Sequence, residues 1–260
     1  MLHLGLALVL ALTGSTGWTA TQRHRGPEGS PTASSKLTYG HHKLRIEDTD
    51  RVVIVDLADG AMTYVDRQSR TWASISLAEL VRKRDEKLEE LKAKIDELPE
   101  NLKRQFKEDL ERQRALDKKA PELKQTNERD VVSGYACRVV RWTSSDGEGT
   151  ACVSTEIPVD LSAFQQDVKA LGQKLIEVGA SGTTASMDFL RLSDDGFPVR
   201  TRQQIRLAPG QTVQTETVFE GVQSATVEPS MVSPPDEFQR VSFESLMQSI
   251  LRRSMSEPEK

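Results

Sequence analysis

The feature that most constrains this fold is a series of short apolar segments, separated by turn residues, between residues 43 and 75. Asp59-Gly60 lies between two of them and is a hairpin signal, because glycine accepts the positive φ of a tight turn. The sequence therefore predicts an antiparallel meander here. Weaker strands are predicted before it, over residues 18–25 and 32–39.

A second strand-rich block begins near residue 131, where residues 134–142 and 150–154 flank the hairpin signal Asp146-Gly147. Further strands are predicted at residues 185–192, 198–207, 211–219 and 222–232, with turns at Asp195-Gly196, Pro209-Gly210 and Gly221. The two blocks together give about eleven strands.

The pattern changes at Ser76, where apolar residues recur every three or four positions among many charges. Ser76 and Glu79 form a capping-box pattern that begins a helix, and Pro99 fits the first turn of a second helix. We therefore expect a helical hairpin over residues 76–117, with one narrow apolar stripe to bury. A single kinked coiled-coil rod that finds a partner is the alternative.

A third helix is predicted after Asp160, which is a good N-cap residue. Its apolar residues share one face and form a seam that must bury against the sheet. The seam consists of Leu161, Phe164, Val168, Leu171, Leu175 and Val178. A cavity along this seam would hold an apolar ligand, whereas complete packing would make it ordinary core. A last apolar stripe, from Phe243 to Leu251, predicts a C-terminal helix.

Residues 2–12 form an apolar run that small residues end, which is the pattern of a signal peptide over residues 1–17. A mis-set start codon is the alternative. The run is too short for a transmembrane anchor, so we expect a periplasmic or secreted protein that begins between Trp18 and Thr21. The net charge of -4 includes no basic block, which argues against a nucleic-acid partner.

Few residues could support chemistry. His41 and His42 are adjacent and would face opposite ways on a strand, and no metal-binding spacing or phosphate-binding glycine loop occurs. Glu47, Asp48 and Asp50 resemble only the start of a calcium loop, and we interpret them as a solvated turn. We expect a protein that is not an enzyme, with no catalytic residues, no metal and no cofactor.

The two cysteines, Cys137 and Cys152, fall on the two strands of the second hairpin. Thiols tend to pair in an oxidising compartment, so we expect a disulfide. A two-residue turn at residues 146–147 would leave the thiols out of register, whereas a bulge or a loop centred near residues 144–145 would place them opposite each other. Two buried free cysteines are the alternative.

Several short motifs occur in an order that is typical of one bacterial family. They are Lys43-Leu44-Arg45, Ile54-Val55-Asp56, Met62-Thr63-Tyr64-Val65-Asp66, Thr71-Trp72, Leu98-Pro99-Glu100, Gly134-Tyr135-Ala136-Cys137 and Gly196-Phe197-Pro198-Val199-Arg200. The chain resembles the family called domain of unknown function 4412, which is similar to the periplasmic lipoprotein carriers LolA and LolB. The resemblance implies an α+β fold: a curved antiparallel sheet, an incomplete barrel, with helices on its concave side and an inserted helical hairpin.

These expectations divide the chain into a β-rich domain over residues 18–240, with a helical insertion at 76–127, and a C-terminal helix and tail over 241–260. Two functions fit. The first is a carrier or chaperone that holds a lipid or other apolar ligand between sheet and helices. The second is a module that docks an envelope protein partner through its charged helical hairpin. A lined cavity would favour the carrier, and a filled core with an exposed Leu and Phe stripe would favour the module.

Overall fold

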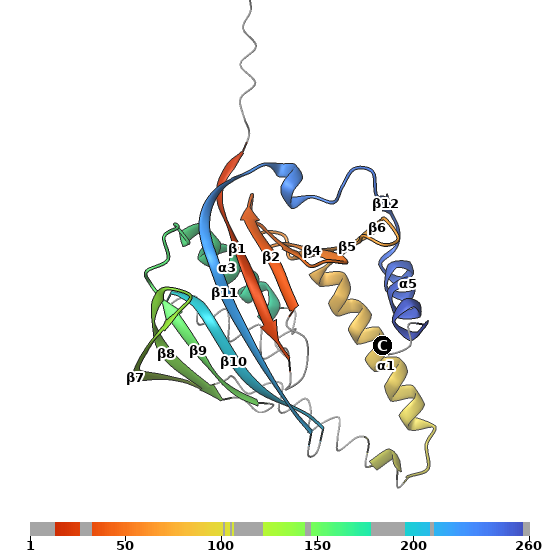
Figure 1. The fold of residues 1–260 in the computed structure, drawn as a ribbon. Helices are drawn as coiled ribbons and strands as arrows, with labels where there is room; N and C mark the ends of the chain where they lie inside the picture. Colours follow the sequence, from red (N-terminus) through yellow and green to blue (C-terminus); the bar gives the residue numbers. More distant parts are fainter. Residues whose placement is uncertain are drawn as a thin grey trace, which may run out of the picture.

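The computed structural model describes residues 14–26, 33–100, 102–104, 106, 122–143, 147–177, 196–208 and 211–256. In these ranges the chain forms one twelve-stranded sheet, three complete α-helices and one 3-10 helix (Figure 1). Residues 100, 102–104 and 106 are also helical, so the second helix predicted to begin at Pro99 is present in its first described residues. The strands are β1 Ser15–Arg25, β2 Ala33–Gly40, β3 Lys43–Glu47, β4 Arg51–Asp56, β5 Ala61–Asp66, β6 Thr71–Ser76, β7 Glu122–Val132, β8 Tyr135–Thr143, β9 Gly147–Ser154, β10 Phe197–Ala208, β11 Gln211–Val227 and β12 Gln239–Arg240. The helices are α1 Leu77–Asp96, α3 Ser162–Glu177, η2 Pro229–Val232 and α5 Phe243–Ser256.

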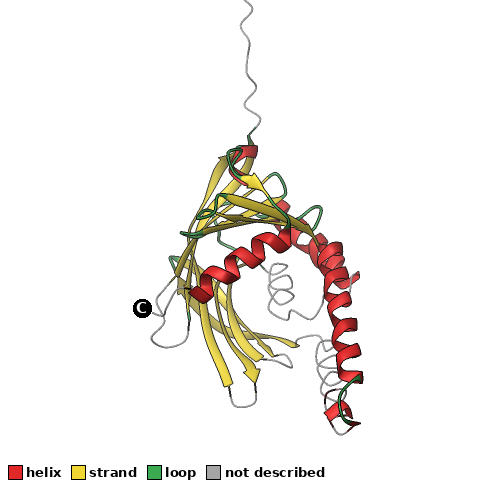
Figure 2. Cartoon of the chain, turned by 90° about the vertical axis from the view of Figure 1, so that its right-hand side faces the viewer, coloured by secondary structure: helices red, strands yellow, loops and turns green. Residues whose placement is uncertain are grey.

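The strand order is β12-β6-β5-β4-β3-β2-β1-β11-β10-β9-β8-β7. Neighbouring strands are antiparallel except β12 and β6, which are parallel. The sheet curves strongly (Figure 2), and α3 lies behind β11, β1 and β2 in the view of Figure 1, on the side where the main core packs. The predicted fold class, a curved open antiparallel sheet with helices, is confirmed, although the sheet has twelve strands rather than about eleven.

The observed strands differ from the predicted strands in two regions, residues 185–192 and residues 211–232. The predicted strand 185–192 and the seam residue Val178 lie outside the described residues. Residues 211–219 and 222–232 were expected to be separate strands, but β11 runs through Gly221 and ends at Val227. Gly221 has a φ of 60° and lies where the β1 register shifts, so it makes a β-bulge instead of a turn.

The edge strand β7 begins at Glu122, although the sequence predicts a strand only from Val131 and places the end of the helical insertion at residue 127. Its side chains are mostly polar and exposed, because an edge strand that packs against little else has no apolar pattern. Residues 101, 105 and 107–117 of the predicted helical hairpin lie outside the described residues.

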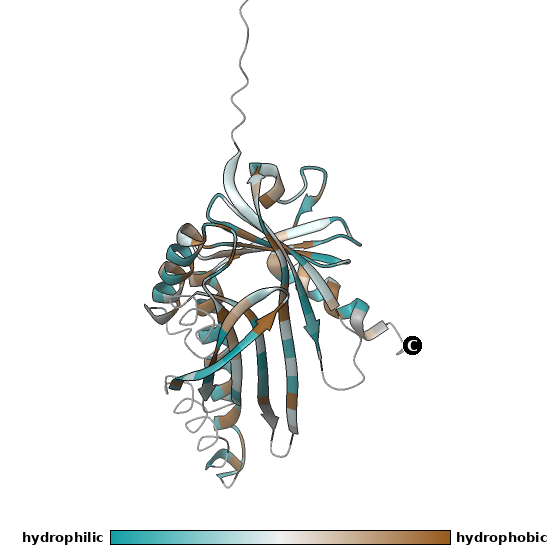
Figure 3. Ribbon diagram, turned by 60° about the vertical axis from the view of Figure 1, so that its left-hand side comes forward, coloured by the Kyte–Doolittle hydropathy of each residue, from teal (hydrophilic) through white to brown (hydrophobic). Residues whose placement is uncertain are grey.

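The predicted start of the first helix is confirmed. The Ser76 hydroxyl accepts a hydrogen bond from the Glu79 backbone N–H at 3.1 Å, and α1 follows directly. The apolar stripe of α1 is only partly covered, since Leu77 and Ile95 are buried and Leu91 is 45% exposed. The charged side chains outside the stripe give α1 its mixed colouring in Figure 3.

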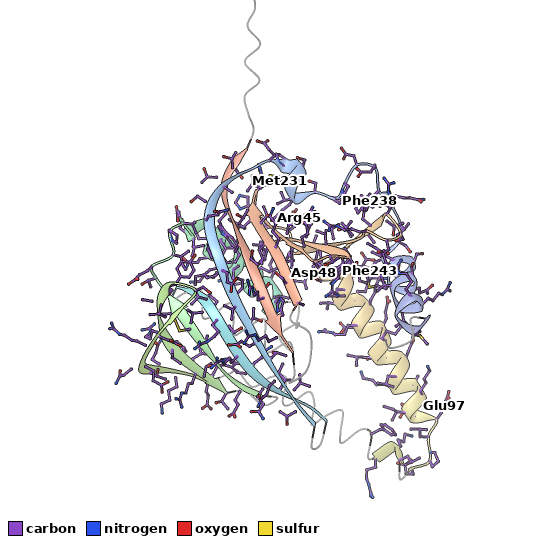
Figure 4. The ribbon with its side chains drawn as sticks, viewed as in Figure 1. Arg45, Asp48, Glu97, Met231, Phe238 and Phe243 are labelled. Carbon is purple, nitrogen blue, oxygen red and sulfur yellow. A yellow bond between two sulfur atoms is a disulfide. The ribbon has the colours of Figure 1, made fainter. Side chains whose placement is uncertain are left out.

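The C-terminal segment passes around the edge of the sheet at β6. Tyr64 and Val65 are adjacent on β5 and therefore point to opposite faces. Phe238 packs with Val65 on one face, whereas the Phe243 ring meets the Tyr64 ring on the other with centroids 5.6 Å apart. Between them β12 pairs with β6, so α5 reaches the sheet face opposite Phe238 (Figure 4).

Candidate functional site

The predicted seam on α3 lies against the concave face of the sheet, and its first half is filled. Asp160 caps the helix by accepting from the Ser162 N–H at 2.9 Å, as the sequence predicts. Phe164 is 2% exposed, and its ring meets the rings of Trp18 and Tyr39 with centroids 5.1 Å away in each case. Side chains therefore occupy the space that a ligand would need here.

The second half of the seam is less covered. Val168 is buried, whereas Leu161, Leu171 and Leu175 are half-buried. Leu171 approaches Gly60 in the turn between β4 and β5. The Lys174 ammonium donates to the Ala58 carbonyl in the same turn. Thus α3 crosses from β1 to the β4–β5 turn.

Three polar side chains fix α3 at the β2–β3 turn. The Tyr39 hydroxyl donates to the Asp167 carboxylate at 2.6 Å, and His42 Nδ1 lies 3.0 Å from both oxygens of that carboxylate. Burial raises the pKa of the Tyr39 hydroxyl, and the hydrogen bond to Asp167 and its negative charge raise it further. Tyr39 therefore stays protonated and acts as a donor, which suits an anchor rather than a base.

His41 and His42 form the turn between β2 and β3, so the opposite orientation that they would have on a strand does not arise. Their φ values are 53° and 59°, which a two-residue hairpin turn of this kind requires at both positions. His41 Nε2 lies 2.8 Å from the Val227 carbonyl at the end of β11. Both rings therefore make contacts with other elements of the fold.

A second apolar surface lies on strands β3, β4 and β5, which we call the meander wall. It consists of two cross-strand rows of half-buried side chains, Leu44, Val55 and Met62 in one row and Ile46, Val53 and Tyr64 in the other. Leu44 and Val55 pack against the main core, so the wall shares the face that α3 covers. Alternation in the sequence already indicates Val53, Val55 and Tyr64 as strand residues against which the seam can bury.

The disulfide between Cys137 and Cys152 is confirmed, with the two Cα atoms 5.3 Å apart. The strand register lies between the two predicted ones, because Val139 faces Cys152 and the last pair before the loop is Thr143 with Glu148. The hairpin connection is thus longer than a two-residue turn. Both cysteines belong to the main core cluster with Phe164.

The chain that forms this curved sheet, crossing helix and disulfide also matches a known protein family in sequence. The family model "Domain of unknown function (DUF4412)" matches residues 101–238, which is more than half of the chain. The chain belongs to the DUF4412 family.

Solved structures with a similar course of the chain are only distantly related to this DUF4412 protein. PNGF-II matches with a TM-score of 0.41 and 8% identity over 92% of this chain and 33% of its own. The Pseudomonas aeruginosa MucA/MucB complex matches with a TM-score of 0.36 and 13% identity over 87% of this chain and 58% of that one. The DUF4412 chain thus spans about a third of PNGF-II and 58% of the MucA/MucB chain. None of the curated proteins matches the sequence.

Two of the three carboxylates that resemble a calcium loop, those of Glu47 and Asp48, accept hydrogen bonds from side chains of the DUF4412 chain itself. Arg67 and Arg45 donate to Glu47, while Ser35 and Arg51 donate to Asp48. Burial opposes ionisation, but these hydrogen bonds and charges lower the pKa of both carboxyls. Within the described residues no group of three potential metal ligands converges, and no helix is long and apolar enough to cross a membrane.

Exposed apolar side chains gather on the helices of the DUF4412 chain. Of the large exposed hydrophobic residues in the described ranges, most lie on α1, on the helical residues that follow Pro99 or on α5, and we call these the helical flank: Leu91, Leu102, Phe106, Ile250, Leu251 and Met255. An exposed Leu and Phe stripe on the helical hairpin is the feature that favours an interaction module. The sequence does not predict exposed apolar side chains on α5. The i, i+4 spacing of Leu251 and Met255 was the available signal.

Proposed function

We propose that this DUF4412 protein is an exported, non-catalytic binding module that docks a protein partner through its helical flank. The observation that carries the proposal is the contrast between two apolar surfaces. Phe164 is 2% exposed in the seam, whereas Leu102 is 40% and Phe106 50% exposed on the flank. Exposed apolar residues grouped in this way mark interaction sites more often than isolated ones do.

Export is supported by two independent features. The N-terminal apolar run has the pattern of a signal peptide, and the Cys137–Cys152 disulfide is typical of proteins from oxidising compartments. A non-catalytic role is supported by the polar groups around α3. Asp167 is held between Tyr39 and His42 and links α3 to the sheet, so its carboxylate already serves the fold.

Partner capture from the native envelope tests this function. The tagged protein and the variant L91S/L102S/F106S are compared by quantitative mass spectrometry of captured proteins. We expect one stoichiometric partner with the wild type, and its loss with the variant. V131S is the matched control, since Val131 is 67% exposed on β7, away from the flank. Equal capture by all three proteins, or by none, would refute the module.

A carrier role is the second candidate, and the meander wall favours it. Ile46, Val53 and Tyr64 are half-buried and stand outside the packed core clusters, so they could line an apolar ligand site. Native mass spectrometry of protein purified from its own envelope distinguishes the two. A bound lipid mass would support the carrier. An unliganded mass, with no change in melting temperature on addition of a fatty acid, would exclude it.

A further inference from the structure

We propose that the sheet carries, on the face opposite α3, a binding site for a saccharide with one anionic group. The site is a hollow of about 420 Å³ between β1, β2, the β11 bulge and residues 47–49, and we call it the polar cup. It contains none of the helical flank residues, so the inference goes beyond the proposed docking function. Its uncharged polar groups and its lysine belong to Thr19, Thr21, Ser34, Thr49, Gln223 and Lys36.

The strand pattern directs these side chains away from the core. Ala20 and Leu37 belong to the main core cluster, to which α3 also contributes. Thr19 and Thr21 flank Ala20, and Lys36 precedes Leu37, so the three polar side chains point to the other face of the sheet. Thr21 lies opposite Lys36 in the regular pairing of β1 with β2. The cup therefore opens on the face opposite α3.

The bulge in β11 makes room at one side of the cup. Gly221 has a φ of 60° and lies where the pairing of β11 with β1 shifts register. A Cβ atom placed on Gly221 would meet no atom within 4 Å. A side chain at this position would therefore occupy free space beside the cup instead of clashing with the protein.

Lys36 supplies a positive charge that the described part of the chain leaves unpaired. It forms no ion pair with any described residue, although Glu47 lies opposite it on β3. The Glu47 carboxylate instead accepts hydrogen bonds from Arg45 and Arg67. Lys36 can therefore bind an anionic group of a ligand without losing a partner in the fold.

The other polar groups of the cup are also available. The side chains of Thr19, Thr21 and Gln223 make no hydrogen bond within the described ranges, and hydroxyls and amides can both donate and accept. Glu47 and Asp48 each accept from two side chains of the protein. A carboxylate has about four acceptor sites, so both can still accept from ligand hydroxyls. This lining matches a ligand that is covered with hydroxyl groups.

The charges and the size of the cup select among ligands. An apolar ligand would cover its polar groups without replacing their hydrogen bonds to water. A small inorganic anion would fill little of the hollow and would place its charge near Glu47 and Asp48. A neutral sugar would leave Lys36 without a counter-charge. A saccharide with one carboxylate or phosphate group gives an anion to Lys36 and hydroxyl donors to the two carboxylates.

Nuclear magnetic resonance with the isotope-labelled full chain tests this site. The probes are glucuronate, glucose 6-phosphate, glucose and sodium phosphate at equal ionic strength. We expect the amide signals of Thr21 and Gln223 to shift saturably with at least one acidic sugar, and glucose to bind more weakly by roughly tenfold or more. No saturable shift with either acidic sugar, or equal affinity for glucose or phosphate, would overturn the proposal.

Variants then locate the site. K36Q should reduce the affinity for the acidic sugar to that for glucose, because it removes only the positive charge. G221N should weaken both sugars, since asparagine tolerates a positive φ and its side chain would enter the free space beside the cup. K124Q removes an exposed lysine from β7 and is the matched control, which should bind as the wild type does.

Circular dichroism confirms that each variant is folded, and T21V, which replaces a cup hydroxyl with a methyl group, is used if G221N is not. Unchanged affinity in K36Q would overturn the proposal. So would binding to phosphatidylglycerol vesicles that depends on Lys36 while neither acidic sugar binds, because the cation would then serve a membrane surface.

Discussion

The indole ring of Trp18 and the phenyl ring of Phe164 meet edge to face, with centroids 5.1 Å apart and planes at 88°. Trp18 lies on β1, near one end of the chain, and Phe164 lies on α3, so this pair fixes the crossing helix to the middle of the sheet. Edge-to-face pairs add to the stabilisation that burial provides. The Tyr39 and Phe197 rings complete the cluster around Trp18.

Replacing Phe164 with alanine should destabilise the fold strongly. The side chain is 2% exposed, so its loss removes buried apolar surface and leaves a cavity among rigid rings. We expect a decrease of about 3–5 kcal/mol in the free energy of unfolding, measured by urea denaturation. Gln173→Ala, on an exposed position of the same helix, is the control and should change stability by less than about 0.5 kcal/mol. Similar small changes in both variants would show that the seam is loosely packed.

The pairing of β1 predicts signal cleavage before Ser15, which is earlier than the start between Trp18 and Thr21 that the small residues predict. Ser15 to Thr19 pair with β11 residues 227 to 223, and Trp18 is 1% exposed. A chain that begins at Ala20 would lose both the pairing and the indole ring. We expect protein that begins at Ser15 to melt cooperatively and protein that begins at Ala20 to be unfolded or greatly destabilised. N-terminal sequencing of the exported protein checks the natural start, and a native, stable protein starting at Ala20 would contradict the prediction.

The disulfide should stabilise the fold by constraining the unfolded chain. Cys137 and Cys152 are separated by 15 residues, for which loop closure predicts about 3 kcal/mol. C137S/C152S should therefore unfold at lower urea concentration, whereas thiol labelling of denatured, unreduced wild type should find no free cysteine. Labelling of two thiols in freshly exported protein would show that the bond does not form in the cell.

Sequence patterns predicted the parts of the fold that depend on local chemistry. The turn glycine Gly60, the N-caps Ser76 and Asp160 and the amphipathic stripe of α3 each have a local physical cause, and each is found as predicted. Register and edges were harder to predict, because they depend on partners distant in sequence. Gly221 makes a bulge only because β1 lies opposite it, and the polar β7 is a strand only because β8 pairs with it.

The candidate binding surface was also only partly predictable from the sequence, because it too depends on residues that are distant along the chain. Periodicity identified the apolar seam on α3, but it could not show that Trp18 and Tyr39 fill the space beside Phe164. The side of α5 that meets the sheet likewise depends on the path of the chain around β6. No local sequence pattern specifies that path. Whether an apolar stripe is core or surface is therefore a tertiary property.

The ion pair between Arg253 and Asp66 makes the attachment of α5 sensitive to acid. Burial on its own would raise the pKa of the Asp66 carboxyl, but hydrogen bonds from Ser69 and Arg253 and the charge of Arg253 outweigh it, so the pKa is lowered. A carboxyl with a lowered pKa in the folded state contributes stability above its unfolded pKa. It loses that contribution as the pH falls through its folded pKa. Acid should therefore weaken the contact between α5 and the sheet.

Arg253→Ala tests this dependence. Asp66 is 4% exposed, so removing its charged partner should cost about 2 kcal/mol of unfolding free energy near neutral pH. The difference from wild type should shrink below about pH 4, because protonation of Asp66 then removes the same interaction from the wild-type protein. Arg252→Ala, which changes the neighbouring exposed arginine, is the control. Urea denaturation across the pH series measures both variants, and a deficit for Arg253→Ala that is constant with pH would mean that packing of the arginine stem, and not the ion pair, holds α5 in place.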